Sequence, residues 1–407
     1  KTASFTAVSG TGYFINTTSA AITMNLPASP SAGDIVSFKD YAFTFATNNL
    51  TVDGNGSPIG GVDGTILPTY DTNGTSKTFI YVDGTKGWLV VNESTDTSAE
   101  QSPTFTAATG GTITECGDFK IHTFTGPGTF AVTAVGNFPT LPSGGPNTIN
   151  YMVIGGGGGT STTGGCGDGS GGAGGGGFRE GKQGTDNGTY TASPLAAVCS
   201  GLPISIQSYP VTVGGGGSPF STGPDLGKGS NSVFSTITSA GGGQGGEVST
   251  PNKSPFLPGG SGGGHGGTGT PAVTNPGGSG NTPPVSPPQG NNGGSGNGPT
   301  GGGGGGASAT GTGGSAGSGG PGGNGVTTNI IGSPVAYAGG GGGATRPPCG
   351  GSGGTGGTGG GGNAITPSTP APVSGKGTAG GTNTGGGAGA PGASGGSGIV
   401  VIRYKFQ

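Results

Sequence analysis

The sequence has few charged residues, two histidines and one tryptophan. Only 7% of its 407 residues are charged and 28% are hydrophobic, whereas globular domains carry about a quarter and nearly half. An ordinary α/β or helical enzyme is therefore not expected. With 13 basic and 16 acidic residues and a net charge of −3, the chain has no basic patch to neutralise phosphates. We expect no nucleic-acid partner.

Long apolar runs are also missing. The run at 399–402 is closed by Arg403 and is far shorter than a membrane-spanning segment, so we expect no membrane insertion. The chain begins at Lys1 without Met, and no apolar signal segment follows. This start is typical of a processed product or of part of a longer protein.

Residues for catalysis or metal binding are scarce. The repeated Gly-x-Gly-x-x-Gly spacing does not open a helix after a strand, as a nucleotide site requires. His122 lies on an expected strand, where a core or surface position is the simplest interpretation. We expect no catalytic residue, no metal, no cofactor and no enzymatic activity. The cysteines are too widely spaced for a zinc site and allow three disulfide pairings or none: Cys116, Cys166, Cys199 and Cys349.

Glycine dominates instead. The chain has 109 Gly and 32 Pro, and an interior Gly costs a helix about 1 kcal/mol relative to Ala. Helices are therefore excluded for most of the chain. The glycines gather in the C-terminal part, so the sequence predicts a β-sandwich-like module at 1–98, a linker at 99–103 and a glycine-rich domain at 104–407.

Alternating apolar and polar residues predict β-strands in both regions. Ile22, Met24 and Leu26 alternate with polar residues, which places one face of a strand in a core. Turn signals every 8–12 residues favour a small sandwich there. In the glycine-rich domain, most expected strands run straight into a glycine tract; they lie at 119–154, 209–213, 233–238, 335–338 and 398–405.

The glycine tracts carry a period of three. In 311–325, two of every three positions are nearly all Gly, and the third frame holds Thr312, Ser315, Ser318, Pro321 and Asn324. This period matches a polyproline-II helix, whose N–H and C=O groups point sideways and pair with neighbours. Two glycine edges allow close packing, and the third carries small residues toward solvent or another layer. Collagen needs one Gly in every three residues, whereas these tracts have two, so collagen is not expected. Disorder is not favoured either, because a disordered chain would not require a fixed three-residue register.

The predicted fold is therefore all-β, with packed polyglycine helices between the strands. Bulky or cationic side chains beside the tracts are the candidate receptor-binding residues, because rigid loops are where binding residues concentrate. His265, inside a glycine run, is expected to face outward, whereas the aromatic candidates would alternatively pack at strand ends. The candidates are Phe220, Phe256, Leu257, His265 and Arg346.

Several short sequence segments resemble those of a known protein family. GYFINTTS at 12–19, NLPASPSAGD at 25–34 and YVDGTKGW at 81–88 resemble the β modules of tail-fibre proteins from marine and cyanobacterial phages. Residues 119–154, with FTGPGTF, and the ending GGSGIVVIRY at 395–404 are similar to the glycine-rich domain at their C-termini. The tracts also resemble the polyglycine-helix sandwich in tip adhesins of some tailed phages.

The resemblance implies an extracellular virion fibre, usually a homotrimer, that contacts other tail proteins and a host polysaccharide or outer-membrane protein. We expect a receptor-binding tail-fibre protein, with loops such as 251–258 and 281–292 as contacts. The alternative is a purely structural virion fibre or decoration protein, or a self-assembling extracellular filament subunit, with no receptor.

Overall fold

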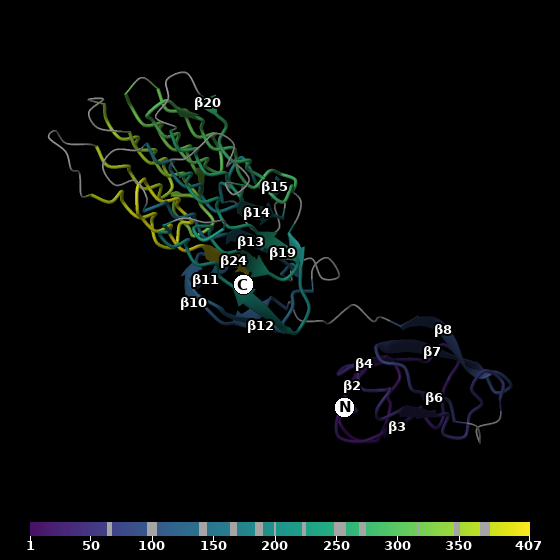
Figure 1. Cartoon of the computed structure of the whole chain (residues 1–407). Helices are drawn as coiled ribbons and strands as arrows, with labels where there is room; N and C mark the ends of the chain where they lie inside the picture. Colours follow the sequence, from purple (N-terminus) through teal and green to yellow (C-terminus); the bar gives the residue numbers. More distant parts are fainter. Residues whose placement is uncertain are drawn as a thin grey trace. The chain divides into compact units, whose positions relative to one another are not determined.

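The computed structural model describes the chain apart from a set of short segments, and it divides into two compact units, Lys1–Ser102 and Pro103–Gln407 (Figure 1). The predicted linker at 99–103 lies outside the described residues. The fold is all-β, and no helix occurs among the residues described. The described residues are 1–62, 67–95, 104–137, 145–162, 169–183, 190–198, 201–221, 225–247, 258–267, 274–315, 317–345, 351–366 and 375–407.

Unit 1 consists of two four-stranded sheets that enclose a common core. The alternation predicted around Ile22 is confirmed, because Ile22, Met24 and Leu26 are all buried. Trp88 is buried in the same core and contacts Tyr81 edge-on, with ring centroids 5.5 Å apart. One sheet has the order β1 (Phe5–Thr6), β3 (Ile22–Asn25), β5 (Leu50–Asp53), β6 (Thr69–Tyr70), and the other β2 (Thr11–Ile15), β4 (Ile35–Asp40), β7 (Thr75–Asp83), β8 (Gly87–Thr95).

Unit 2 contains a seven-stranded and a five-stranded sheet. The larger has the order β10 (Thr112–Cys116), β11 (Phe119–Phe124), β24 (Ile399–Lys405), β13 (Thr148–Ile154), β14 (Phe178–Lys182), β15 (Ala197–Val198), and β16 (Leu202–Pro203) also pairs with β13. The smaller has the order β19 (Ile237–Ser239), β18 (Ser232–Phe234), β17 (Ser208–Thr212), β12 (Gly128–Ala134), β9 (Ala107–Thr109). Two short pairs complete the set: β20 (Thr274–Asn275) with β21 (Gly296–Asn297), and β22 (Val326–Thr328) with β23 (Val335–Tyr337).

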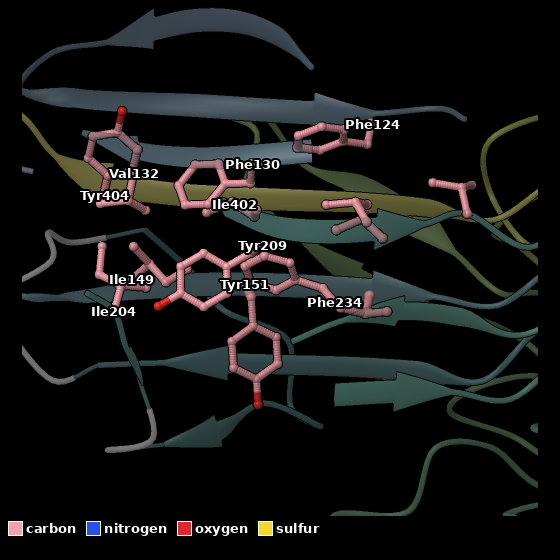
Figure 2. Packing of buried hydrophobic residues seen from close by; sticks show 14 residues of the cluster. Phe124, Phe130, Val132, Ile149, Tyr151, Ile204, Tyr209, Phe234, Ile402 and Tyr404 are labelled. Carbon is pink, nitrogen blue, oxygen red and sulfur yellow. The ribbon is translucent and has the colours of Figure 1, made fainter. Parts of the chain in front are cut away.

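The central strand β13 has apolar residues on both faces. Ile149 and Tyr151 point into the core between the two sheets, where Figure 2 shows the aromatic rings gathered. Met152 and Ile154 belong instead to a second core, which includes Tyr337 from the glycine-rich part. The seven-stranded sheet is thus covered on one face by the five-stranded sheet and on the other by the ends of the glycine tracts.

The glycine tracts continue directly from the strands and bond with a period of three. Tract 155–162 follows β13, and its N–H groups donate in turn to neighbouring tracts, so that every third N–H returns to the same one. The donor–acceptor pairs are Gly155 with Gly177 and Gly158 with Gly174; Gly156 with Ser230 and Gly159 with Gly227; Gly157 with Gly396 and Thr160 with Ala393. This is the pattern that the three-residue turn of a polyproline-II helix produces.

Tract 169–177 is surrounded by other tracts on all sides, and its residues 171–177 are all buried. Its N–H groups donate to tracts at 240–246, 302–305 and 385–388, and its carbonyls accept from 155–158, 261–264 and 341–344. Tracts 301–307 and 338–344 are also wholly buried. The backbone groups of these interior tracts therefore bond to one another rather than to water. We call this hydrogen-bonded array the glycine lattice.

Candidate functional site

Every tract runs between the sheets and an opposite end. Tract 155–162 leads away from β13 and tract 169–177 returns to β14, so Thr162 and Gly169 lie at the end remote from the sheets. We call this the loop end, and the other the sheet end (Figure 1). The described turns at the loop end are 297–300, where Thr300 bridges Thr345, 315–318 apart from residue 316, and 391–393.

Several described tracts end at the loop end immediately before a segment that lies outside the described residues. Thr162, Gly267 and Thr345 each precede such a segment, and their tracts are joined there by hydrogen bonds. Gly267 N–H donates to the carbonyl of Gly169 at 2.6 Å, and Thr345 Oγ1 donates to Gly317 at 2.8 Å. Segments 163–168, 222–224, 268–273, 346–350 and 367–374 follow described tract ends at this end.

Phe220 lies at the loop end but is buried, with 5% of its surface exposed. Its carbonyl accepts hydrogen bonds from the N–H and Oγ1 of Thr162, the latter at 3.0 Å. A β-carbon at Gly227 would lie 2.4 Å from the Phe220 ring, so the ring occupies the space that this glycine leaves. Phe220 therefore packs against the neighbouring tract instead of facing solvent.

The outward orientation expected of His265 is wrong. Its side chain is 4% exposed, and its Nδ1 donates to the carbonyl of Gly266 at 2.7 Å. The His265 N–H donates to Gly294 at 3.0 Å, and its carbonyl accepts from Gly302 at 2.9 Å. Tract 258–267 is bonded to neighbours on several sides, and the side chain at this position is correspondingly buried.

The other predicted contact residues, Phe256, Leu257 and Arg346, lie outside the described residues, as does segment 251–257 of the first candidate loop. The second loop, 281–292, lies at the sheet end. There the carbonyl of Gln289 accepts from the N–H of Phe178, the first residue of β14, at 2.8 Å, and Gln289 is 1% exposed. Of the candidates, the structure therefore places Phe220 and His265 near the loop end, both buried.

His122 occupies a core position between the two sheets. Its Nδ1 donates to the carbonyl of Gly110 at 2.7 Å, and its Nε2, 3.1 Å from the hydroxyl of Tyr404, accepts from it. Burial lowers the pKa of His122 below its usual 6.5, and the charge of Lys120 adds to this, while the bond to Gly110 opposes it. Burial also raises the pKa of Tyr404 to about 12.

Sequence reasoning missed a buried polar cluster on the other face of the seven-stranded sheet. Glu180, 2% exposed, accepts hydrogen bonds from the hydroxyl of Tyr190 at 3.1 Å, from Thr328 Oγ1 at 2.7 Å and from Ser193 N–H at 2.9 Å. The guanidinium of Arg403 lies 5.3 Å from the centroid of the Tyr190 ring. Burial, together with the charge of Glu180, raises the pKa of Tyr190. Thr328 and Arg403 lie far from Glu180 in the sequence, so no local motif joins them to it.

Among the residues that the structure describes, no group of His, Cys, Asp and Glu is arranged to hold a metal ion. Cys116 is half-buried and unpaired within the same part of the chain, and the other three cysteines lie outside it. A search of the described segments finds no helix that could span a membrane.

Comparison with known proteins identifies a glycine-rich domain. The family model described as "Glycine-rich domain" matches residues 132–405. The chain belongs to this glycine-rich domain family. The match includes both sheets of unit 2 in part, with β13, β24 and the whole glycine lattice between them. No curated protein matches the chain.

Proposed function

We propose that this glycine-rich domain protein is a phage virion tail-fibre protein that attaches to the host cell without enzymatic activity. Its place would be extracellular, on the virion, and its receptor a host-surface polysaccharide or an outer-membrane protein bound at the loop end. The phrases at 12–19, 25–34 and 81–88 support the fibre assignment through their resemblance to phage tail-fibre modules.

The observation that carries the proposal is a second set of tract ends at the end of the hydrogen-bonded bundle remote from the sheets, where the described turns are 297–300, 315–318 apart from residue 316, and 391–393. The other end is fixed to the seven-stranded sheet, for example where tract 155–162 continues β13 and tract 169–177 enters β14. A contact surface held on such a scaffold loses little conformational entropy when it binds. In this proposal, the buried Phe220 and His265 pack inside the loop end and do not contact the receptor.

Segments 346–350, which begins with the candidate Arg346, and 367–374 are the candidates for the contact, because Thr345 and Thr366 bring the chain to the loop end immediately before them. Arg346 supplies the first of these segments with a cationic group, and Pro347 and Pro348 restrict its conformations. Such a segment would suit recognition by a hydrogen-bonding or anionic host surface.

The test replaces 346–350 and, separately, 367–374 with Gly/Ser sequence of equal length and measures binding of the labelled chain to a panel of cyanobacterial and marine bacterial strains. We expect the loss of binding to strains that the wild type binds. The matched control replaces the exposed sheet-end turn 332–334 with Gly-Gly-Gly and retains binding. Equal binding by all variants would contradict the proposal and favour a purely structural fibre.

A further inference from the structure

The surface tract 351–358 of the glycine lattice carries its side chains in one frame only. In tract 351–358, a β-carbon at Gly354 would lie 2.2 Å from the carbonyl oxygen of Gly320, and one at Gly356 would lie 2.0 Å from that of Gly361. Real β-carbons do not approach oxygen so closely, so these two frames must be glycine. The remaining frame consists of exposed residues: Ser352, Thr355 and Thr358.

Exposed side chains at intervals of three recur on other surface tracts, although tract 375–382 also has Thr378 in a second frame, where its Oγ1 donates to the carbonyl of Asn363 at 3.2 Å. Outward-facing residues are exposed at intervals of three, whereas the interior tract 171–177 has only Ala173 among its glycines. The exposed outward residues include Thr312 and Ser315, Pro321 and Asn324, and Lys376, Ala379 and Thr382.

At the margin of the lattice, side-chain oxygens accept hydrogen bonds from backbone N–H groups. Asn324 Oδ1 accepts the N–H of Thr358 at 3.1 Å, and Asn363 Oδ1 accepts the N–H of Gly356 at 2.8 Å. Thr366 Oγ1 accepts the N–H of Gly353 at 3.3 Å. A further glycine tract arriving here would find these donors already occupied.

We propose that the outward side chains and the marginal amides close the glycine lattice, so that the bundle is complete within one chain and a second copy cannot add to it. A tract approaching Ser352 or Thr355 at the spacing seen inside the lattice would place its carbonyl oxygens about 2 Å from their β-carbons, as at the interior glycines. Copies of the chain then meet through other surfaces. This inference does not depend on the proposed receptor function.

The test removes the β-carbons from one surface tract. The full-length variant Ser352→Gly/Thr355→Gly/Thr358→Gly presents a glycine edge, and we expect it to associate laterally. Its weight-average mass in sedimentation velocity should rise about twofold or more over the wild type at equal concentration. Amide hydrogen exchange at positions 352 and 355 should slow as these N–H groups acquire partners in the second copy.

The matched control is Ser352→Ala/Thr355→Ala/Thr358→Ala, which removes the hydroxyls and keeps the β-carbons; it should sediment like the wild type. Association of the alanine variant, or wild-type sedimentation of a folded glycine variant, would overturn the proposal. Slow exchange at interior Gly172 establishes folding. If the first glycine variant does not fold, Lys376→Gly/Ala379→Gly/Thr382→Gly makes the same test on tract 375–382, with the corresponding alanine control.

Discussion

A β-carbon at Gly172 would lie 2.1 Å from the carbonyl oxygen of Gly341, so the tracts that carry these two glycines touch backbone to backbone. The contact is reciprocal along the tracts, because the N–H of Gly341 donates to the neighbouring carbonyl of Ala173 at 2.8 Å. The close approach that requires glycine at position 172 is therefore the same approach that forms the hydrogen bonds between the two tracts. A side chain is therefore excluded wherever its β-carbon would face a neighbouring carbonyl in this way, whereas the buried Ala173, Ala388 and Ala393 pack against one another at interior positions that leave room for a methyl group.

Gly172 and Gly215 form a matched pair for this requirement. At Gly215 a β-carbon would meet nothing within 4 Å. We expect Gly172→Ala to destabilise unit 2 by about 3 kcal/mol or more, because a backbone carbonyl cannot move aside as a side chain does. Gly215→Ala should leave the free energy of unfolding unchanged or raise it by about 0.4–1 kcal/mol, since Ala restricts the unfolded chain. Denaturant unfolding followed by hydrogen exchange of the interior glycines measures both; equal effects would contradict the lattice.

The sequence carries more of this architecture than its composition indicates. The triplet period at 311–325 correctly predicts polyproline-II tracts with exposed Thr312, Pro321 and Asn324. The uninterrupted runs at 301–306 and 339–343 mark interior tracts, because neighbours on every side leave little room for side chains. That distinction is visible in the sequence once the hydrogen-bond pattern is known.

The positions of individual side chains were harder to predict. The lone polar group of His265 indicates an exposed residue when read locally, yet tract 258–267 is bonded to tracts more than 20 residues away along the chain in either direction. Glu180 and Arg403 belong to one cluster through Tyr190. Such positions depend on which tracts become neighbours, and a period of three does not specify that.

Acid should weaken unit 2 through His122. Its folded pKa is lowered, so between pH 6.5 and that lower value the unfolded chain binds a proton that the folded chain does not. Stability is therefore fully present above pH 6.5 and falls as the pH decreases below it, by up to about 1.4 kcal/mol per unit. His122→Gln should remove this slope in denaturant unfolding monitored by near-ultraviolet circular dichroism. If the dependence of stability on pH is unchanged in this variant, it arises from another titratable group.

Glu180 should be sensitive to loss of one acceptor. Glu180→Gln replaces a carboxylate oxygen with an amide donor that faces either Ser193 N–H or the hydroxyls of Tyr190 and Thr328. We expect a loss of about 1–3 kcal/mol in the free energy of unfolding of unit 2, the cost of buried unpaired donors. The control is Glu115→Gln, whose side chain is 59% exposed beside Lys120 and which should change stability by less than about 0.5 kcal/mol. Similar losses in both variants would mean that burial of Glu180 is not what sets the cost.

Trp88 offers a signal for unit 1 alone. It is the one tryptophan of the sequence, and it lies fully buried in the core of unit 1, whose members all precede residue 103. Leu50→Ala, which empties part of that core, should lower the free energy of the fluorescence transition by about 2–5 kcal/mol. The same variant should leave hydrogen exchange of the interior glycines of unit 2 as in the wild type.

Gly172→Ala should do the reverse: it should speed hydrogen exchange of the interior glycine amides and leave the Trp88 fluorescence transition unchanged. Fluorescence and exchange that move together in both variants would show that the two units unfold as one, and the separate cores would then not act as separate cooperative structures.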